Sequence, residues 1–193
     1  MRKSEMLRDG TEIILRDYTP ADMDASYRFY QRLAPEERAY MRIDVTRRDV
    51  LERQFRDVAE GRAVRLVAMA GDELVGTGVV ELSPISWDSH RGELRLSVAP
   101  EYRNKGLGRK LVTELFREAK ERGVQKAVAR FMPEQGAIRG LLEHLGWHMD
   151  AVLPGFVRDQ TGTSHDQVVM SCTMDECWEE LQGYYSSDDW PDG

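Results

Sequence analysis

A short segment in the middle of the chain joins three local patterns that few folds accommodate together. Residues 94–98, LRLSV, form an apolar run and lead into a loop, residues 99–106, that carries glycine and positive charge. From Leu107 to Ala119 apolar residues recur at helical spacing, and Gly123 stands where a helix ends. A strand, a basic loop and a helix in direct succession place the loop at the positive end of the helix dipole. The segment predicts an α/β fold with an anion site at the helix start.

Further strands and helices are expected on both sides of this segment. Runs rich in β-branched and apolar residues are typical of strands at 11–18, 63–70, 74–82, 93–99, 124–132, 147–157 and 166–174. Capping signals at Thr19 and Thr46 predict two early helices, and Gly146 ends a late one over 138–145. This order predicts a sheet that is antiparallel at first and gains parallel pairing around the central helix.

The charge of the chain is concentrated at its C-terminal end. The formal net charge is −7, from 34 acidic and 27 basic residues. Residues 175–193 hold 7 of the acids and no Lys or Arg, so the body carries 27 of each sign. We expect a domain over 1–174 and an acidic, aromatic-containing appendage over 175–193. A balanced body argues against nucleic acid as a partner, because such binding depends on surplus positive charge.

Other broad classes are excluded by what the sequence lacks. It has no apolar run of about 18 residues, so a membrane partner is not expected, and the N-terminus is polar where a signal peptide is apolar. Cys172 and Cys177 are too few for a disulfide framework and make a poor metal site. We expect reduced thiols, no metal and a cytoplasmic location.

The glycine-containing loop has a chemical interpretation of its own. Gly106 and Gly108 let the backbone approach a ligand closely, and Arg103, Lys105 and Arg109 add charge around it. A phosphate or pyrophosphate suits such a site. The other interpretation is a solvated helix start that binds nothing. A Walker loop and a dinucleotide fingerprint are excluded, the second because Leu111 stands where a third glycine is needed.

The segment RNKGLG, from Arg103 to Gly108, resembles the R/Q-x-x-G-x-G/A hallmark of the GNAT superfamily of acyl-CoA-dependent N-acyltransferases. The later AIRGLLEHLGW, residues 137–147, resembles a second family motif. The resemblance covers roughly residues 10 to 174. It implies a mixed, centrally splayed sheet with helices on both faces, and acetyl-CoA as cosubstrate. The residues implied to hold its pyrophosphate are Arg103, Asn104, Lys105, Gly106, Leu107, Gly108 and Arg109.

The same resemblance implies where the rest of the coenzyme lies. Leu96, Ser97 and Val98 would line the pantetheine arm, in a splay opened by a bulge. A backbone N–H near Val98 would face the thioester carbonyl, where it stabilises the negative charge that builds up during attack by an amine. Val98 is therefore the implied oxyanion donor.

Catalysis also needs a group that removes a proton from the amine. An amine with a pKa of about 10.4 is almost entirely protonated at neutral pH. Glu93, at the start of the same strand, is the candidate general base. GELRLSVAPEYR, residues 92–103, is similar to the corresponding segment of bacterial Pat-type protein-lysine acetyltransferases, in which a glutamate has this spacing. Glu81 and His90 are reserve candidates, and a solvated carboxylate at a strand start is the alternative for Glu93.

The sequence departs from the family at one position that bears on activity. Many members place a tyrosine acid in the late helix, where this chain has Leu142. We therefore expect an N-acetyltransferase that acts without this acid, on a small amine or a protein lysine. The alternative is an inactive acyl-CoA-binding sensor or interaction module. A homodimer is left open as a partner.

Overall fold

The computed structural model describes residues 2–83 and 87–185, with side chains as far as Leu181 in the last helix. The strands are β1 (Arg2–Met6), β2 (Glu12–Asp17), β3 (Ala63–Ala70), β4 (Glu73–Leu82), β5 (Arg91–Val98), β6 (Lys126–Phe131), β7 (His148–Arg158) and β8 (Ser164–Thr173). The α-helices are α1 (Met23–Arg32), α2 (Pro35–Ala39), α3 (Arg48–Ala59), α4 (Leu107–Glu121), α5 (Gly136–His144) and α6 (Met174–Tyr185). Short 3₁₀ turns, η1 (Pro20–Asp22) and η2 (Pro100–Tyr102), precede α1 and α4.

The strands form one sheet in the order β1-β2-β3-β4-β5-β6-β8-β7. Neighbours in it are antiparallel except β5 and β6, which run parallel on either side of the α4 crossover. The expected change from antiparallel to parallel pairing around the central helix is confirmed. Sequence patterns missed β1 and the five-residue α2.

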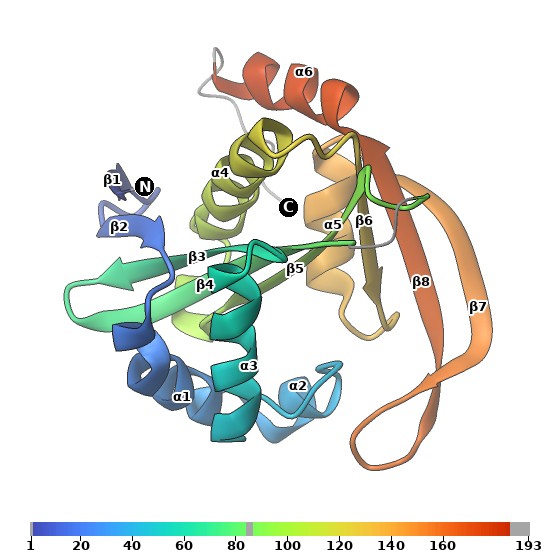
Figure 1. Cartoon of the computed structure of the whole chain (residues 1–193), viewed down its shortest axis with the longest axis horizontal. Helices are drawn as coiled ribbons and strands as arrows, with labels where there is room; N and C mark the ends of the chain where they lie inside the picture. The colour runs from blue at the N-terminus through green and yellow to red at the C-terminus, as the bar shows by residue number, and fades with distance from the viewer. Residues whose placement is uncertain (1, 84–86, 186–193) are drawn as a thin grey trace.

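Helices cover both faces of the sheet, as expected (Figure 1). One face packs on α4, α5 and α6 through a large apolar cluster that includes Leu94, Leu115 and Leu142. The other face packs on α1 and α3 through a smaller cluster around Phe29 and Leu51. Alternate residues of β5 therefore face two different layers, because successive side chains of a strand point to opposite faces.

The sheet opens in its middle, between β5 and β6. Paired residues run only from Arg91–Lys126 to Glu93–Val128, although β5 continues to Val98 and β6 to Phe131. The expectation of a centrally splayed sheet is confirmed. The bulge implied in this strand is absent, since β5 pairs with β4 in continuous register over its described length. The opening arises from the divergence of β5 and β6.

Several local features that the sequence predicted form in the structure. Gly71, with φ of 57°, makes the tight turn between β3 and β4. Thr19 and Asp22 form the predicted capping box, and Asp22 also accepts from both Nη atoms of Arg16. The second predicted capping box does not form, because Thr46 bonds to Asp44 instead.

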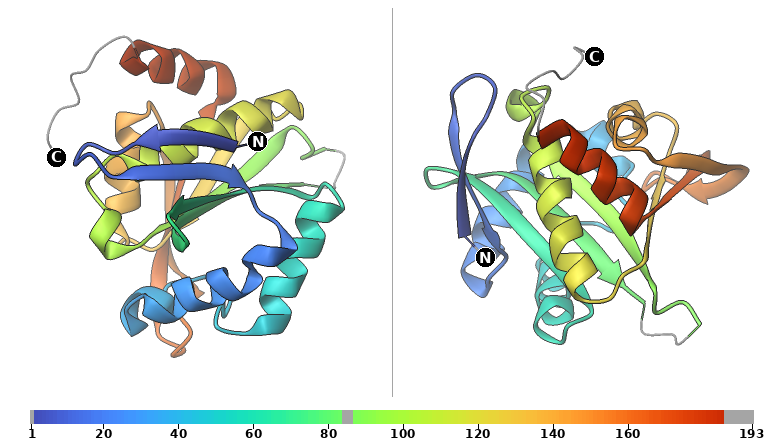
Figure 2. Two further views of the ribbon diagram at one scale, coloured as in Figure 1. Left: turned by 90° about the vertical axis from the view of Figure 1, so that its left-hand side faces the viewer. Right: turned by 90° about the horizontal axis from the view of Figure 1, so that it is seen from above.

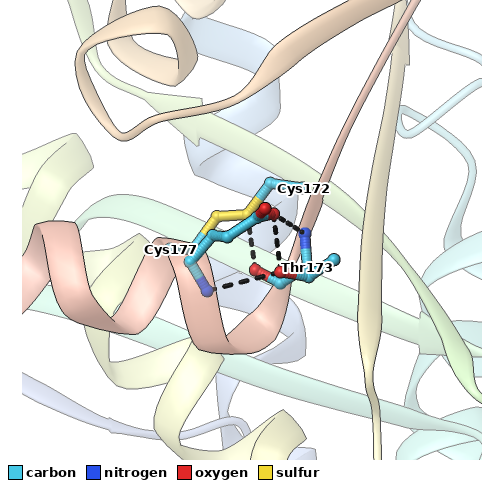
Figure 3. Close-up of a disulfide and its surroundings, with 4 residues drawn as sticks. Cys172, Thr173 and Cys177 are labelled. Carbon is cyan, nitrogen blue, oxygen red and sulfur yellow. Dashed lines mark hydrogen bonds between the residues drawn. A yellow bond between two sulfur atoms is a disulfide. The ribbon is translucent and has the colours of Figure 1, made fainter.

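Cys172 and Cys177 form a disulfide (Figure 3). Cys172 is near the end of β8 and Cys177 is in the first turns of α6, which follows the strand without a loop. This connection brings their Cα atoms to 6.4 Å, and both residues are buried. The expectation of reduced thiols is wrong for this pair, because sequence spacing does not show how closely a strand and the next helix turn back on each other.

The helix α6 lies beside α4 (Figure 2). It contributes Met174, Cys177 and Leu181 to the large apolar cluster, and Trp178 packs against that cluster. The division at residue 174 into a domain and an appendage stays a prediction, and residues 186–193 of that segment lie outside the described residues.

Candidate active site

A cavity of about 1760 Å³ runs through the opening between β5 and β6. The cavity is lined by the start of α4 and the loop before it, by residues 94–98 and 129–132 beside the opening, and by residues from α1 to α3. The volume exceeds that of a typical single-ligand pocket, roughly 300–1,000 Å³. The cavity can hold two molecules that meet between the strands.

The loop before α4 borders the cavity over residues 103–106. Asn104 and Gly106 have φ of 58° and 85°, both left-handed. The N–H of Lys110 donates to the Gly106 carbonyl over 3.1 Å, and the N–H groups of Leu107 and Gly108 precede this bond in the first turn of α4. A Cβ at Gly108 would lie 3.2 Å from Leu141 Cδ2. The small size of Gly108 permits close packing of α4.

Two of the basic residues in this loop already have partners. Arg103 donates from Nη1 and Nη2 to Glu37, over 2.6 and 3.0 Å, and from Nε to the Val98 carbonyl over 3.1 Å. Lys105 pairs with Asp9 over 2.8 Å, and this bond holds the pKa of the Asp9 carboxyl at about 2. Arg103 therefore ties the loop to α2, and Lys105 ties it to the turn after β1. Arg109 lines the cavity.

The exposed edge of β5 presents backbone groups to the opening. The N–H of Ala99 donates to Val75 over 2.9 Å, on the β4 side. Because backbone groups of successive residues point to opposite edges of a strand, the N–H of Val98 points toward β6. Its carbonyl, on the same edge, accepts from Arg103. The amide of Val98 thus faces the gap.

Glu93 lies at the last paired position of β5 and β6, and its side chain is 16% exposed. Its Oε1 accepts from Arg42 over 2.7 Å, and its Oε2 accepts from Arg130 over 2.5 Å. Glu81, its antiparallel neighbour on β4, pairs with Arg95. His90 is exposed and is not among the residues that line the cavity. The structure thus places Glu93 at the cavity, beside Arg42 and Arg130.

Sequence reasoning missed the arginines at this end of the cavity, which are Arg42, Arg65, Arg95 and Arg130. Arg95 follows Glu93 by two residues, and the period of a strand could have placed both on one face. The others come from distant parts of the sequence, and no local pattern marks them.

The late helix α5 presents residues to the cavity other than the expected one. Leu141 and His144 line the cavity, whereas Leu142 is fully buried in the large apolar cluster. Gln135, just before the helix, accepts the N–H of Met132 on its side-chain oxygen over 3.0 Å.

The turn between β7 and β8 contacts the segment after α2. The backbone N–H of Gln160 donates to the Ala39 carbonyl over 3.1 Å. Its side-chain Nε2 donates to the carbonyls of Met41 and Ile43, over 3.3 Å each. Met41 and Ile43 themselves line the cavity. The turn therefore holds the segment after α2 in place.

Membrane-spanning helices and clustered metal ligands are both absent from residues 2–83 and 87–185. None of the helices in these ranges is both long and apolar enough to cross a membrane. The same residues hold no group of three or more His, Cys, Asp or Glu side chains arranged for a metal ion.

The sheet opens between two parallel strands, with the start of α4 at the gap, and this fold is shared with solved acetyltransferase structures. The chain belongs to the acetyltransferase (GNAT) family, because the model of that family matches residues 23–147. No curated protein matches the sequence.

Solved structures of this family share the fold. A ribosomal-protein-alanine N-acetyltransferase from Brucella melitensis is 23% identical, with a TM-score of 0.71 over 82% of this chain and 98% of that one. A putative acetyltransferase, yncA, from Salmonella typhimurium, solved with acetyl-CoA, is 22% identical, with a TM-score of 0.73 over 84% and 94%. The GNAT domain of PAT from S. lividans is 19% identical, with a TM-score of 0.74 over 89% and 96%.

Proposed function

We propose that this protein transfers the acetyl group of acetyl-CoA directly to a primary amine. The observation that carries the proposal is the cavity between β5 and β6, which joins an anion-binding loop at one end to a charged pocket at the other. A donor and an acceptor bound at the two ends would meet in the middle. The structure of yncA with acetyl-CoA, which shares this fold, supports the choice of donor.

The loop from Arg103 to Arg109 is the proposed pyrophosphate site. Its left-handed residues and the first N–H groups of α4 offer several donors to one anion. Leu96, Ser97 and Val98 are proposed to line the pantetheine arm, since all three border the cavity. The amide of Val98 points into the gap and is the proposed donor to the thioester oxygen.

Glu93 is the proposed general base, acting directly or through one water molecule. Its carboxylate has about four lone-pair sites, and Arg42 and Arg130 each use one, so each oxygen can accept a further proton donor. In the proposed step the amine gives a proton to Glu93 and its nitrogen attacks the carbonyl carbon. The C–N bond forms, the C–S bond breaks, and coenzyme A leaves as the thiolate. The second proton of the nitrogen passes to the departing thiolate or to water. A thiol with a pKa of about 8.5 leaves readily without an acid.

A second candidate is a module that binds acyl-CoA without turnover. Leu142 favours it, because this residue is buried in the core where many members of the family carry a tyrosine acid. The two candidates differ in one measurable respect, since only the enzyme releases free thiol in the presence of an amine.

The test is a thiol-release assay with acetyl-CoA and a panel of amines that includes lysine peptides, with products identified by mass spectrometry. Release that depends on an amine, together with an N-acetylated product, is the expected result. Binding of acetyl-CoA without release across the panel would favour the module. Failure to bind acetyl-CoA at all would exclude both.

A further inference from the structure

The end of the cavity on the α1 and α3 side of the sheet holds more positive charge than its carboxylates balance. Glu93 accepts from Arg42 and Arg130, and Glu81 pairs with Arg95. Arg65 is a fourth guanidinium in this group. Glu81 lies outside the cavity lining, and the carboxylates of the lining besides Glu93 are Glu37, paired with Arg103, Glu134, paired with His165, and the exposed Glu36. Four guanidinium groups thus face two carboxylates, Glu81 and Glu93.

Arg65 is the most informative member of this group. It lies on β3 and is 6% exposed, yet it borders the cavity. In the part of the chain that the structure describes, its side chain has no carboxylate partner and its Nε donates no hydrogen bond. Its guanidinium lies over the ring of Tyr18, with 5.6 Å between Cζ and the ring centroid. A buried charge without a counter-ion is costly, and proteins rarely keep one without a ligand that neutralises it.

Arg95, on a second strand, pairs with Glu81 but shares one feature with Arg65, a buried Nε without a partner among the described residues. It is the cross-strand neighbour of Val79, which is in turn the neighbour of Arg65, so the two arginines lie on one face of the sheet with one strand between them. Burial, together with the charges of Arg42 and Arg65, lowers the pKa of Arg95 to about 10. An anion bound between these arginines would offset the cost of burying their charges and would reduce the repulsion between them.

We propose that the acceptor is a small amine that carries an anionic group, held between Arg65 and Arg95 while its nitrogen points to Glu93. This inference rests on the proposed function and names its substrate class. A guanidinium pairs with a carboxylate or a phosphate through two parallel hydrogen bonds. Glu93 and Arg95 are two residues apart on one face of β5, which separates them by about 7 Å. That spacing suits an amine and an anion within one small molecule.

The same charges disfavour a lysine within a basic peptide. Such an acceptor would bring further cations toward Arg42, Arg65 and Arg130 and would meet repulsion in a site of low dielectric. We therefore expect the protein to acetylate the anionic amine in preference to the lysine peptide, and one assay can compare the two.

The experiment compares amines with and without an anionic group. The pairs are β-alanine with β-alaninamide, γ-aminobutyrate with its amide, and O-phosphoethanolamine with ethanolamine, each with acetyl-CoA and the full chain. We expect kcat/KM to be about 10- to 100-fold higher for the anionic member of at least one pair, the range of a charged hydrogen bond. An amide group lowers the pKa of the amine more than a carboxylate does, so more of the amine is neutral and reactive in the amide. A preference for the acids therefore cannot come from amine basicity and indicates binding of the anionic group. The pair with the largest ratio distinguishes carboxylate from phosphate.

Variants of Arg65 test whether this buried residue causes the preference for anionic amines. Arg65→Met should reduce the anionic preference to within about threefold, mainly through KM, and Arg65→Lys should retain part of it because the charge remains. Arg53→Met, at an exposed position of α3 outside the cavity lining, is the matched control and should keep the preference. Calorimetric binding of acetyl-CoA to each variant checks that the fold is intact.

The outcomes separate this inference from the proposed function. Turnover of amines without preference for the anionic members, or a preference unchanged in Arg65→Met, overturns the inference and leaves the proposed function standing. If no amine is acetylated, calorimetry of the same amines with the enzyme–coenzyme A complex decides. Anion binding that Arg65→Met abolishes supports the anionic pocket while the proposed function fails. No binding of any anionic amine overturns both.

Discussion

Arg130 on β6 donates to Glu93 on β5, with 2.5 Å between Nη1 and Oε2, and this contact bridges the strands at the point where they separate. Arg42, from the segment after α2, donates to the other oxygen of Glu93. The carboxylate is thus fixed at the apex of the opening, beside the gap that the Val98 amide faces.

Glu93→Gln should lower kcat by about 10²- to 10⁴-fold, because the amide cannot take a proton from the amine. The affinity for acetyl-CoA, measured by calorimetry, should stay the same. Arg42→Gln is the comparison variant, since it removes one ion pair of Glu93 and leaves the carboxylate. An equal loss in both variants would show that Glu93 serves only to hold the arginines.

Gly106→Ala should destabilise the loop before α4. Gly106 has φ of 85°, and a residue with a Cβ adopts this conformation at a cost of about 1 kcal/mol. We expect a lower free energy of unfolding in urea and weaker binding of acetyl-CoA.

Gly140→Ala is the control for that variant. Gly140 lies inside α5, its φ is not positive, and a Cβ there meets no atom within 4 Å. Alanine should raise the free energy of unfolding by up to about 1 kcal/mol, because it favours the helix. If both variants have the same effect, the left-handed conformation of Gly106 has no importance.

Asp22 should make the protein sensitive to acid. Burial alone would raise the pKa of its carboxyl, but donors from Arg16 and Thr19 hold it below its ordinary value. A lowered pKa in the folded state gives stability that is present above about pH 4, the unfolded value, and is lost as the pH falls through the folded value. Asp22→Asn should therefore flatten the dependence of unfolding free energy on pH below about pH 4.

At neutral pH, Asp22→Asn should cost about 2 kcal/mol, since its donors lose a charged acceptor. Asp24→Asn removes an exposed ion pair with Arg48 and should change stability by less than about 0.5 kcal/mol. Equal losses in the two variants would contradict the importance of the buried contact.

Reduction of the disulfide should lower the free energy of unfolding by about 2 kcal/mol, as expected for a short loop of the kind that Cys172 and Cys177 close. Denaturant unfolding with and without dithiothreitol measures this effect. The double variant Cys172→Ser/Cys177→Ser is the control and should not respond to the reductant. A response of the double variant would trace the effect to something other than the disulfide.

Gln160→Ala should raise KM for the acceptor severalfold with little change in the affinity for acetyl-CoA. The change removes the side-chain bonds to the Met41 and Ile43 carbonyls, which hold one wall of the acceptor end. Thr161→Ala provides the comparison, since Thr161 lies in the same turn but bonds to Asp159 and Thr163 within it. A larger effect on the affinity for acetyl-CoA than on KM for the acceptor would contradict the proposed role of the turn in acceptor binding.

The elements that sequence patterns predicted are those specified by nearby residues. The capping box at Thr19, the turn at Gly71 and the helix end at Gly146 each depend on a few neighbours, and each forms. The strand β1 escaped prediction because its segment, RKSEM, is polar, and it becomes a strand by pairing with β2. The disulfide escaped for a similar reason, since it depends on the direct junction of β8 and α6.

The two parts of the candidate site also differ in how far they depend on residues that are distant in the sequence. The loop from Arg103 to Gly108 is contiguous, so its sequence alone indicates an anion site. The proposed acceptor end is assembled from Arg42, Arg65 and Arg130, which lie far apart in the chain and meet only when the sheet forms. Glu93 could be identified as a candidate, but its partners could not.

Because β5 and β6 diverge, some backbone groups on one edge of β5 do not pair with β6. Beyond Glu93, one edge of β5 has no neighbouring strand on the β6 side, although it lies in the interior of the sheet. A ligand that bonds to this edge completes the sheet and binds only the folded chain. The free energy of unfolding then increases with ligand concentration, by about 2.7 kcal/mol at 100 times Kd. Where acetyl-CoA is that ligand, the metabolic supply of the donor would govern the lifetime of the protein as well as its rate.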